Sequence, residues 1–323
     1  MRQSKYMAKY AAQRIGFMLL ALFIITFMCF VLIRLLPLPT LSPTDPHAQI
    51  LELKRKAMGY DEPIIKQFGI FLKNIFVNGD WGVSEGRYVG QNVTDIFVSK
   101  LPPTMLVNLY SILISIPIGL ACGIFAALKK NTWVDYTLST ATMVVISVPS
   151  FVYAFLLKYF LYFKWDIFPP MMELSEDYFS WSVFWSMIPA VLSLSFGVIA
   201  GFTRTTRAEL TEVLTSEFML LARTKGLTRR QATIRHALKN CAVVIVPMIF
   251  GQFIGIMSGS LIIEKIFTVP GVGQLYLEAV NAQDYNMFML LTVFYTAVGL
   301  AAGIVVDISY GFIDPRIRMG SRK

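Results

Sequence analysis

The chain has 323 residues, of which 55% are hydrophobic and only 15% are charged, and its formal net charge is +9. This composition excludes an ordinary soluble protein, so the length has to be divided into membrane spans of about 20 residues each. The basic residues stand in short segments between apolar runs and form no continuous surface, which excludes nucleic acid as the reason for the charge.

Six apolar segments are predicted to be transmembrane helices. The first follows a basic stretch, as a signal peptide does, but it is longer than the roughly 7–15 apolar residues of a signal sequence, so we interpret it as a retained helix. The predicted spans are Ile15–Leu36, Met105–Leu128, Tyr136–Phe163, Phe184–Phe202, Cys241–Ile263 and Met287–Ser309. They divide the chain into an N-terminal segment 1–14, a first span 15–36, a loop 37–104, a core 105–309 that includes the loop 204–240, and a tail 310–323.

The distribution of Lys and Arg predicts the orientation of these spans. Segments 1–14, 129–135, 204–240 and 309–323 together carry 18 of these residues, whereas the two short alternate loops, 164–184 and 264–287, carry one each. Short loops rich in Lys and Arg stay in the cytoplasm. The sequence therefore predicts an all-α integral membrane protein with six spans and both termini cytoplasmic.

The long loop 37–104, which this orientation places outside, contains a predicted amphipathic helix. Asp61, Glu62 and Pro63 form a typical helix start. The apolar residues that follow recur at helical spacing: Ile64, Phe68, Phe71, Leu72, Ile75 and Phe76. We expect this helix to lie flat on the outer membrane face, to pack against the spans, or to belong to a small extracytoplasmic subdomain.

Two basic residues lie within the predicted spans. Lys158 stands well within an apolar run, where a charge is costly enough to indicate a functional site. It is also close enough to the outer boundary for its ammonium group to reach the membrane interface, so snorkelling and contact with a substrate carboxylate are both open. Arg34, near the outer end of the first span, is more simply an interfacial anchor.

The loop 204–240 is longer than a connection between two spans requires, and its first part predicts a short helix. Ser216 is a plausible N-cap, with Glu217 in the first turn. Arg223 and Lys225 follow in the last turn, and Gly226 stands where a left-handed C-cap is favoured.

A second helix is predicted immediately after that glycine. Thr228 and Gln231 have the spacing of a capping box, and the helix continues through Ile234 and Leu238 toward the fifth span. The pattern favours either a pre-shaped docking element or a solvated basic loop.

Glycines mark two further features near the fifth span. Gly251, Gly255 and Gly259 recur every fourth residue, which predicts close approach of a neighbouring helix, from this chain or from a second subunit. Pro270 and Gly271 fit the central positions of a type II turn, in which glycine takes a positive φ. This turn is either a gate at the outer end of a pore or a plain hairpin.

The stretch EFMLLARTKGLTRRQATIRHALKN, 217–240, resembles the signature loop of the permease subunits of ATP-binding-cassette (ABC) importers, in the form of the dipeptide, oligopeptide and nickel permease family. Ala222 and Gly226 fall on the alanine and the glycine of the Glu-Ala-Ala-x-x-x-Gly element, but Leu220 stands at its glutamate. The family's Arg-His-Ala-Leu-x-Asn continuation matches Arg235, His236, Ala237, Leu238 and Asn240.

Three more stretches resemble the same family. Segment 58–84 is similar to its external segment with a Gly-Asp-x-Gly turn, and segment 307–318 is similar to its C-terminal motif. EKIFTVPGVGQL, 264–275, matches the Glu-x-x-Phe-x-x-Pro-Gly-x-Gly element through Glu264, Phe267, Pro270, Gly271 and Gly273. Two further residues depart from the family pattern, Asn286 where proline is common and Gly303 where asparagine is usual.

The resemblance implies a type I ABC importer permease fold, most like the first permease subunit of an oligopeptide importer. It implies that segment 217–240 contains a coupling helix that docks on a cytoplasmic ATPase. The docking residues would be Glu217, Leu221, Ala222, Arg223, Lys225, Gly226 and Leu227. The implied partners are a second homologous permease, two ATPase subunits that hold ATP and magnesium, an extracytoplasmic substrate-binding protein and membrane lipid.

The sequence predicts no catalytic, cofactor or metal site in this chain itself. His47 and His236 stand alone, Cys29, Cys122 and Cys241 have no metal-ligand spacing, and no Gly-x-x-x-x-Gly-Lys-Ser/Thr loop is present to bind ATP. A stand-alone channel or secondary transporter, and a membrane-embedded enzyme, are the alternatives. For the substrate we expect oligopeptides or dipeptides, with nickel chelates or glycosides as alternatives within the same family.

Overall fold

The structure is a computed structural model that describes residues 2–37, 48–175 and 177–313. His47 and the last five residues of the 307–318 motif lie outside these ranges. The chain divides into two compact units: Met1–Thr104 with Met257–Lys265 and Val269–Ala301, and Met105–Ile256 with Ile266–Thr268 and Ala302–Lys323. Each unit is described by itself.

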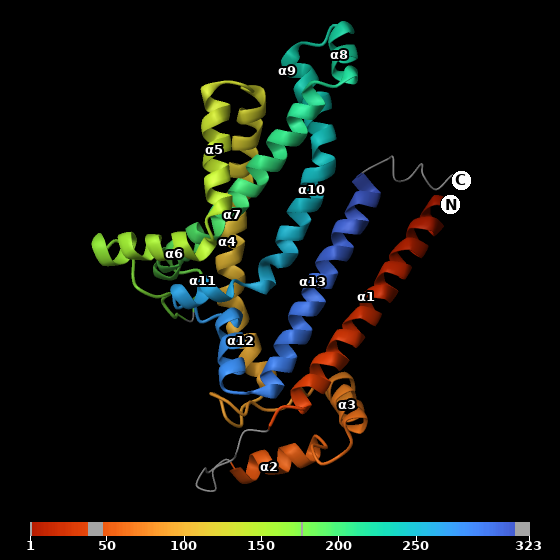
Figure 1. Ribbon diagram of the computed structural model, residues 1–323, viewed down its shortest axis with the longest axis vertical. Coiled ribbons are helices and arrows are strands. Elements are labelled where there is room, and N and C mark those ends of the chain that lie inside the picture. The colour runs from red at the N-terminus through yellow and green to blue at the C-terminus, as the bar shows by residue number, and fades with distance from the viewer. Residues whose placement is uncertain (1, 38–47, 176, 314–323) are drawn as a thin grey trace. The chain divides into compact units, whose positions relative to one another are not determined.

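The described residues are almost entirely helical, as the sequence predicts (Figure 1). The α-helices are α1 (Arg2–Arg34), α2 (Ala48–Ala57), α3 (Ile64–Lys73), α4 (Val93–Leu128), α5 (Trp133–Ser147), α6 (Ser150–Lys158), α7 (Trp181–Leu214), α8 (Glu217–Thr224), α9 (Arg229–Ala232), α10 (Leu238–Gly255), α11 (Leu261–Ile266), α12 (Val272–Asn281) and α13 (Tyr285–Ile313). Short π-helical turns are η1 (Asn74–Asn78), η2 (Tyr159–Lys164) and η3 (Thr233–Ala237), and η4 (Ile256–Ser258) is a 3-10 turn.

Five helical stretches in the described part of the chain are long and apolar enough to cross a membrane, and six if the bent pair α5 and α6 counts as one span. The third predicted span, 136–163, is therefore not straight: its two halves meet at 94°. Pro149 disfavours a helical conformation at the residue before it, and Val148 is extended, with φ −93° and ψ 126°. Figure 1 shows α6 turning away from the direction of α5.

The fifth predicted span ends earlier than we expected. The continuous helix runs over Arg229–Ser258 and stops five residues before Ile263, the predicted end. Gly259 follows with φ +63°, a left-handed conformation that ends the helix. The segment 261–263 belongs instead to the separate short helix α11.

In the first unit, the amphipathic helix predicted in the long loop packs against the first span. Phe68 and Phe71 of α3 lie in an aromatic cluster with Phe27 and Phe30 of α1. The ring centroids are 5.0 Å apart for Phe27 and Phe68, 5.3 Å for Phe30 and Phe68, and 5.1 Å for Phe30 and Phe71. Phe76 does not share this face and is 82% exposed. The π-helical turn η1 accounts for the difference, because it shifts the register of the residues after Lys73.

In the second unit, the core joins α4, α7, α8 and α10. Buried apolar residues from these helices and the short connecting turns form one cluster: Ile112, Ile116, Ala127, Phe202, Leu210, Met219, Ala222, Ala232, Ala237, Cys241, Ile245 and Ile256. Asp135 of α5 is buried and forms an ion pair with Arg207 of α7, which ties α5 to the same core.

A pair of glycines that the sequence analysis did not select lets α4 approach α7. A Cβ atom at Gly119 would lie 2.7 Å from Cβ of Phe202, and one at Gly123 would lie 2.6 Å from Cβ of Thr206. By contrast, nothing lies within 4 Å of a Cβ built at Gly255, and at Gly251 the only such atom is from Val306, at 3.5 Å. Among the described residues, the predicted close approach of a helix is thus not made at Gly251 and Gly255. At Gly259 a Cβ would collide with the Glu264 carboxylate and lie 2.9 Å from Cγ2 of Thr104. Contact with a second subunit stays a prediction.

The glycine pair generates a stability prediction. Gly123→Ala forces a methyl group into the backbone and side chain of α7, so we expect a loss of about 1–3 kcal/mol in the free energy of unfolding. The control is Gly201→Ala in α7, where the added methyl meets no atom within 4 Å and removal of a helical glycine stabilises by up to about 1 kcal/mol. Thermal unfolding of the detergent-solubilised protein measures both, and equal midpoints for the two variants would contradict the packing.

Candidate functional site

The first candidate site is the helical connection between α7 and α10, residues 215–237, which we call the knob. α7 continues to Leu214, so the first part of the predicted loop 204–240 is helix. In the second unit, α8 and α9 stand at the end of the pair formed by α7 and α10 (Figure 1). The knob is therefore carried directly by two long helices.

The helix caps within the knob follow the sequence closely. Ser216 occupies the N-cap position of α8, but its hydroxyl donates to the carbonyl of Val213 at 2.6 Å and caps no N–H group. Gly226 has φ +89° after the last turn of α8, the left-handed conformation that we predicted. The knob thus turns sharply at a residue where a side chain would be strained.

The predicted capping box at the start of α9 is present. The N–H of Gln231 donates to Oγ1 of Thr228 at 3.3 Å, and the N–H of Thr228 donates to Oε1 of Gln231 at 3.0 Å. Because two N–H groups are satisfied reciprocally, the second helix has a defined start. It continues without interruption through η3 into α10.

One face of the knob is buried in the core of the second unit. Met219 and Ala222 belong to the buried cluster, and Leu227 packs against it. The other predicted docking residues, Glu217, Leu221, Arg223, Lys225 and Gly226, are exposed. Ala222 and Leu227 therefore hold the knob in place, whereas the remaining five are available at its surface.

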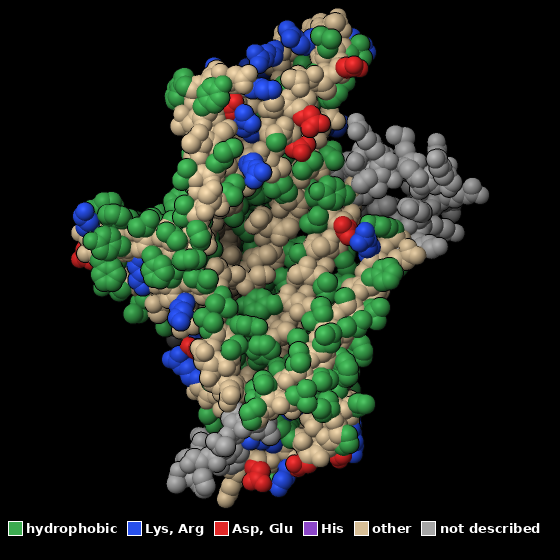
Figure 2. All heavy atoms as spheres, viewed as in Figure 1, with side chains coloured by type: hydrophobic (Ala, Val, Ile, Leu, Met, Phe, Trp, Pro, Cys, Tyr) green, Lys and Arg blue, Asp and Glu red, His purple; other side chains and the backbone are tan. Residues whose placement is uncertain are grey.

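The outer face of α8 is apolar although it is exposed. Phe218, Leu220 and Leu221 are 39%, 64% and 55% exposed, and Lys and Arg side chains gather around α8 and α9 (Figure 2). The sequence analysis named Leu221 but not Phe218, and it treated Leu220 only as a departure from the family pattern. Neighbouring large apolar side chains on a protruding helix, with basic residues around them, are typical of a protein interface.

The continuation residues are partly brought together. Nδ2 of Asn240 donates to the main-chain carbonyl of His236 at 2.9 Å, within the helical run that leads into α10. Arg235 and His236 are exposed on η3. Asn240 thus forms a hydrogen bond within the helix at the base of the knob, and Arg235 and His236 lie on its surface.

The second candidate site is the turn between α11 and α12. Glu264 is 2% exposed, and its carboxylate accepts hydrogen bonds from the N–H groups of Gly273 at 2.9 Å and Gln274 at 3.4 Å, and from the hydroxyl of Thr104 at 3.0 Å. Thr104 in turn accepts from the N–H of Val272 at 2.9 Å. The Glu264 carboxylate therefore caps the N-terminus of α12.

The type II turn that we predicted at Pro270 and Gly271 is wrong. Gly271 has φ −100° and ψ −177°, which any residue can adopt, and the positive φ in this segment belongs to Thr268, at +52°. Glycine is required for a different reason: a Cβ at Gly271 would collide with Thr104 and Glu264, and one at Gly273 would lie 2.9 Å from Oε2 of Glu264. The glycines make room for the carboxylate.

Two sequence features of the first unit are explained by contacts with the start of α13. Nδ2 of Asn286, noted above as a departure from the family pattern, donates to the carbonyl of Val83 at 2.9 Å. Gly82 has φ +92°, and a Cβ there would lie 3.0 Å from the Asn286 side chain. The Gly-Asp-x-Gly turn and Asn286 thus contact each other directly.

The side chain of Lys158 is engaged within the chain. Its Nζ donates a hydrogen bond to the main-chain carbonyl of Ile266. The residue therefore has a polar partner at hand, and contact with a substrate stays a prediction. Phe267, the aromatic residue of the same motif, is buried.

Comparison with known proteins identifies the family. Residues 119–319 match the family described as "Binding-protein-dependent transport system inner membrane component". Residues 7–107 match the family that describes the N-terminal part of the same membrane components. The chain therefore belongs to the family of binding-protein-dependent transport system inner membrane components. It is a multi-pass protein of the cell membrane, and members of this family are permease subunits of ABC importers rather than enzymes themselves.

Individual relatives match over almost the whole length. The chain is 31% identical to the dipeptide transport system permease protein DppB of Lactococcus lactis subsp. cremoris, over 97% of this chain and 100% of the relative. It is 30% identical to the oligopeptide transport system permease protein OppB of Haemophilus influenzae, with the same coverage, and 30% identical to the glutathione transport system permease protein GsiC of Escherichia coli, over 97% and 99%.

Two solved structures share the fold. One is an amino acid ABC transporter crystallised with histidines, with a TM-score of 0.51 and 18% identity over 68% of this chain and 94% of that chain. The other is the MetNI methionine ABC transporter in inward-facing conformations, with a TM-score of 0.50 and 15% identity over 67% and 97%. The predicted importer permease fold is thereby confirmed.

The buried Glu264 generates a prediction of pH dependence. Burial raises the pKa of its carboxyl above the ordinary 4.5, against the opposing effect of the hydrogen bonds from Thr104, Gly273 and Gln274. A raised pKa in the folded state means that the stabilising contribution is complete below 4.5 and is lost as the pH rises through the raised value. We expect wild type to lose stability relative to Glu264→Gln over this range.

Thermal unfolding of both proteins between about pH 4 and pH 8 gives the difference directly. Burial also raises the pKa of Asp284, but that residue is present in both proteins, so its effect cancels in the difference. The matched control is Glu52→Gln at an exposed position of α2. A difference between wild type and Glu264→Gln that stays constant with pH would contradict the proton linkage.

Proposed function

We propose that this chain is one of two permease subunits of an ABC importer that moves oligopeptides or dipeptides across the cytoplasmic membrane. The observation that carries the proposal is the knob, which is capped and buried on its inner face and apolar on its outer face. The relatives named above are permeases for dipeptides, oligopeptides and glutathione, which favours a peptide over a nickel chelate or a glycoside.

The proposed orientation places the knob and both termini in the cytoplasm. The charge asymmetry supports it, since 18 basic residues lie in the segments on one side and two in the short loops on the other. The segment with α2 and α3 then lies outside, where the substrate-binding protein would deliver the peptide.

The proposed partners follow from two features: the exposed surface of the knob, and a sequence without a Gly-x-x-x-x-Gly-Lys-Ser/Thr loop to bind ATP. Two cytoplasmic ATPases would bind ATP and magnesium, and each would receive the knob of one permease. Leu221 and its apolar neighbours would enter a cleft on the ATPase, while Glu217, Arg223 and Lys225 would form polar contacts around them. A second homologous permease would complete the pathway through the membrane.

The mechanism requires the knob to move as a rigid body. Closure of the ATPases on ATP draws the two knobs together, and each knob is fixed to α7 and α10 through the buried cluster around Met219 and Ala222. The long helices therefore follow the knob, and the pathway changes from inward-facing to outward-facing. The buried Glu264 of α11, which caps the N-terminus of α12, keeps the turn between these two helices folded as the long helices move.

A substitution at Gly226 tests whether the knob couples ATP hydrolysis to peptide uptake. In Gly226→Val, a β-branched residue would have to adopt φ +89°, at a cost of about 1–2 kcal/mol or a reshaped turn. We expect ATP-driven peptide uptake into proteoliposomes to fall by about tenfold or more, while ATP hydrolysis by the assembled complex continues. Gly226→Asn, which tolerates positive φ, is the control and should retain most of the uptake. Wild-type uptake by Gly226→Val would count against coupling through this turn.

The exposed apolar face of α8 provides a test of whether the knob docks on an ATPase. Leu221→Asp places a carboxylate where an apolar anchor would be buried, so we expect co-purification of the ATPase subunits with the permease to weaken by about tenfold or more. Leu53→Asp is the matched control, since that leucine is 69% exposed on α2, on the other side in the proposed orientation. A stand-alone channel or secondary transporter predicts that no ATPase co-purifies even with the wild-type chain.

A further inference from the structure

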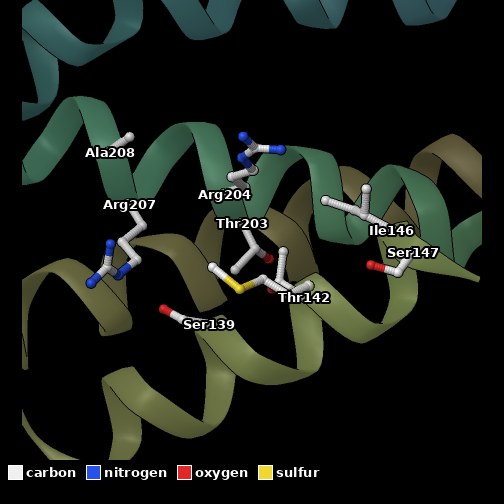
Figure 3. Close-up of a pocket in the computed structure, with 9 residues that line it drawn as sticks. Ser139, Thr142, Ile146, Ser147, Thr203, Arg204, Arg207 and Ala208 are labelled. Carbon is white, nitrogen blue, oxygen red and sulfur yellow. The ribbon is translucent and has the colours of Figure 1, made fainter.

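The second unit contains a cavity between α5 and α7 that belongs neither to the knob nor to the turn between α11 and α12 (Figure 3). Its volume is about 530 Å³, within the range of about 300–1,000 Å³ that is usual for ligand pockets. α5 provides Ser139, Thr142, Met143, Ile146 and Ser147, and α7 provides Thr203, Arg204, Arg207 and Ala208. Both helices belong to the same unit, so the cavity has fixed walls.

The charge of one arginine in this cavity is already neutralised. Arg207 forms the ion pair with Asp135, and Nη2 of the guanidinium donates to the carboxylate at 2.9 Å. Asp135 also accepts from the N–H of Asn131 at 3.0 Å and from the hydroxyl of Ser139 at 3.3 Å. This carboxylate is therefore fully engaged and gives no charge to a second cation.

The other arginine is available. Arg204 is exposed, and it forms no ion pair or hydrogen bond with any residue among those that the structure describes. In Figure 3, Arg207 extends toward α5, whereas the guanidinium of Arg204 extends to the other side of α7. Arg204 is also one of the residues that line the cavity. An exposed guanidinium that has no partner among the described residues is free to bind a carboxylate.

The remaining lining fits a peptide better than a metal chelate. Thr142 and Ser147 offer hydroxyl groups, which donate to and accept from amides, and Met143 and Ile146 offer apolar surface. The hydroxyls of Ser139 and Thr203 already donate to Asp135 and to the carbonyl of Gly119. Among the described residues that line the cavity there is no Asp, Glu, His or Cys, so these residues offer no ligand for nickel and no anion for an amino terminus.

We propose that this cavity binds the C-terminal end of a peptide during its passage, and that Arg204 forms a charge-assisted hydrogen bond with the terminal carboxylate. The proposal rests on the proposed function, since it adds a recognised chemical group to the peptide substrate. A guanidinium is suited to the role because its planar donors match a carboxylate in a bidentate geometry.

The binding test uses thiol protection in the assembled complex. Ser147 lines the cavity and is exposed, so Ser147→Cys, in a chain whose three native cysteines are replaced, reports access to it. In nanodiscs of neutral lipid, we expect tri-alanine to slow alkylation of this thiol and tri-alanine amide to do so about tenfold less effectively. Ser182→Cys, near the other end of α7, should show no protection.

The charge test adds two variants of Arg204 to the same background. Arg204→Gln should abolish the preference for the free carboxylate and raise the KM for tri-alanine uptake about tenfold, whereas Arg204→Lys should keep part of both. The control is Lys130→Gln, an exposed basic residue in the short connection before α5. Equal protection by tri-alanine and its amide, or wild-type behaviour of Arg204→Gln, would overturn the proposal.

Two other outcomes have distinct meanings. Protection of the thiol by nanodiscs containing phosphatidylglycerol, without an effect of tri-alanine, would overturn the proposal and identify the cavity as an anionic-lipid site. A wild-type chain that neither binds ATPase subunits nor imports peptide refutes the proposed function itself. Intact uptake with an unchanged KM in Arg204→Gln refutes only the carboxylate site.

Discussion

The burial of Met219 and Ala222 in the core shared by α4, α7 and α10 is the contact on which the proposed mechanism depends. α8 has only eight residues, and isolated helices shorter than about 12–15 residues are marginal in water. It is held by its inner face and by defined turns at both ends. A force on its outer face therefore acts on the long helices instead of unfolding the short one.

The sequence predicted the features of this knob that are encoded within a few residues. The capping box of Thr228 and Gln231 and the positive φ at Gly226 are local, because each depends on residues less than one helical turn apart. Ser216 shows the limit of such reasoning. Its position at the start of α8 was correct, but α7 ends just before it, and the carbonyl of Val213 in the last turn of α7 accepts a hydrogen bond from its hydroxyl.

Features that depend on distant residues were not predictable in the same way. A four-residue glycine spacing occurs in both α4 and α10. Only the three-dimensional packing shows that Gly119 and Gly123 meet α7, while Gly255 meets no other part of the chain that the structure describes. The motif at 264–275 was located correctly, but the role of its glycines was not. That role depends on Thr104, which is 160 residues away in sequence from Glu264.

The bend at Pro149 and the ion pair of Asp135 with Arg207 together explain why the cavity between α5 and α7 has a defined shape. The ion pair holds the first turn of α5 against α7, and after the bend Tyr153 of α6 packs edge-on against Phe196 of α7, at a centroid distance of 5.5 Å. A buried ion pair contributes little net stability, but breaking it leaves an unpaired charge, so it fixes the register of the two helices. With both ends of the α5–α6 segment attached to α7, the walls of the cavity are rigid and the long side chain of Arg204 at its rim is the adaptable element. An adaptable cation beside fixed walls suits a series of peptides that share a terminal carboxylate and differ in their side chains.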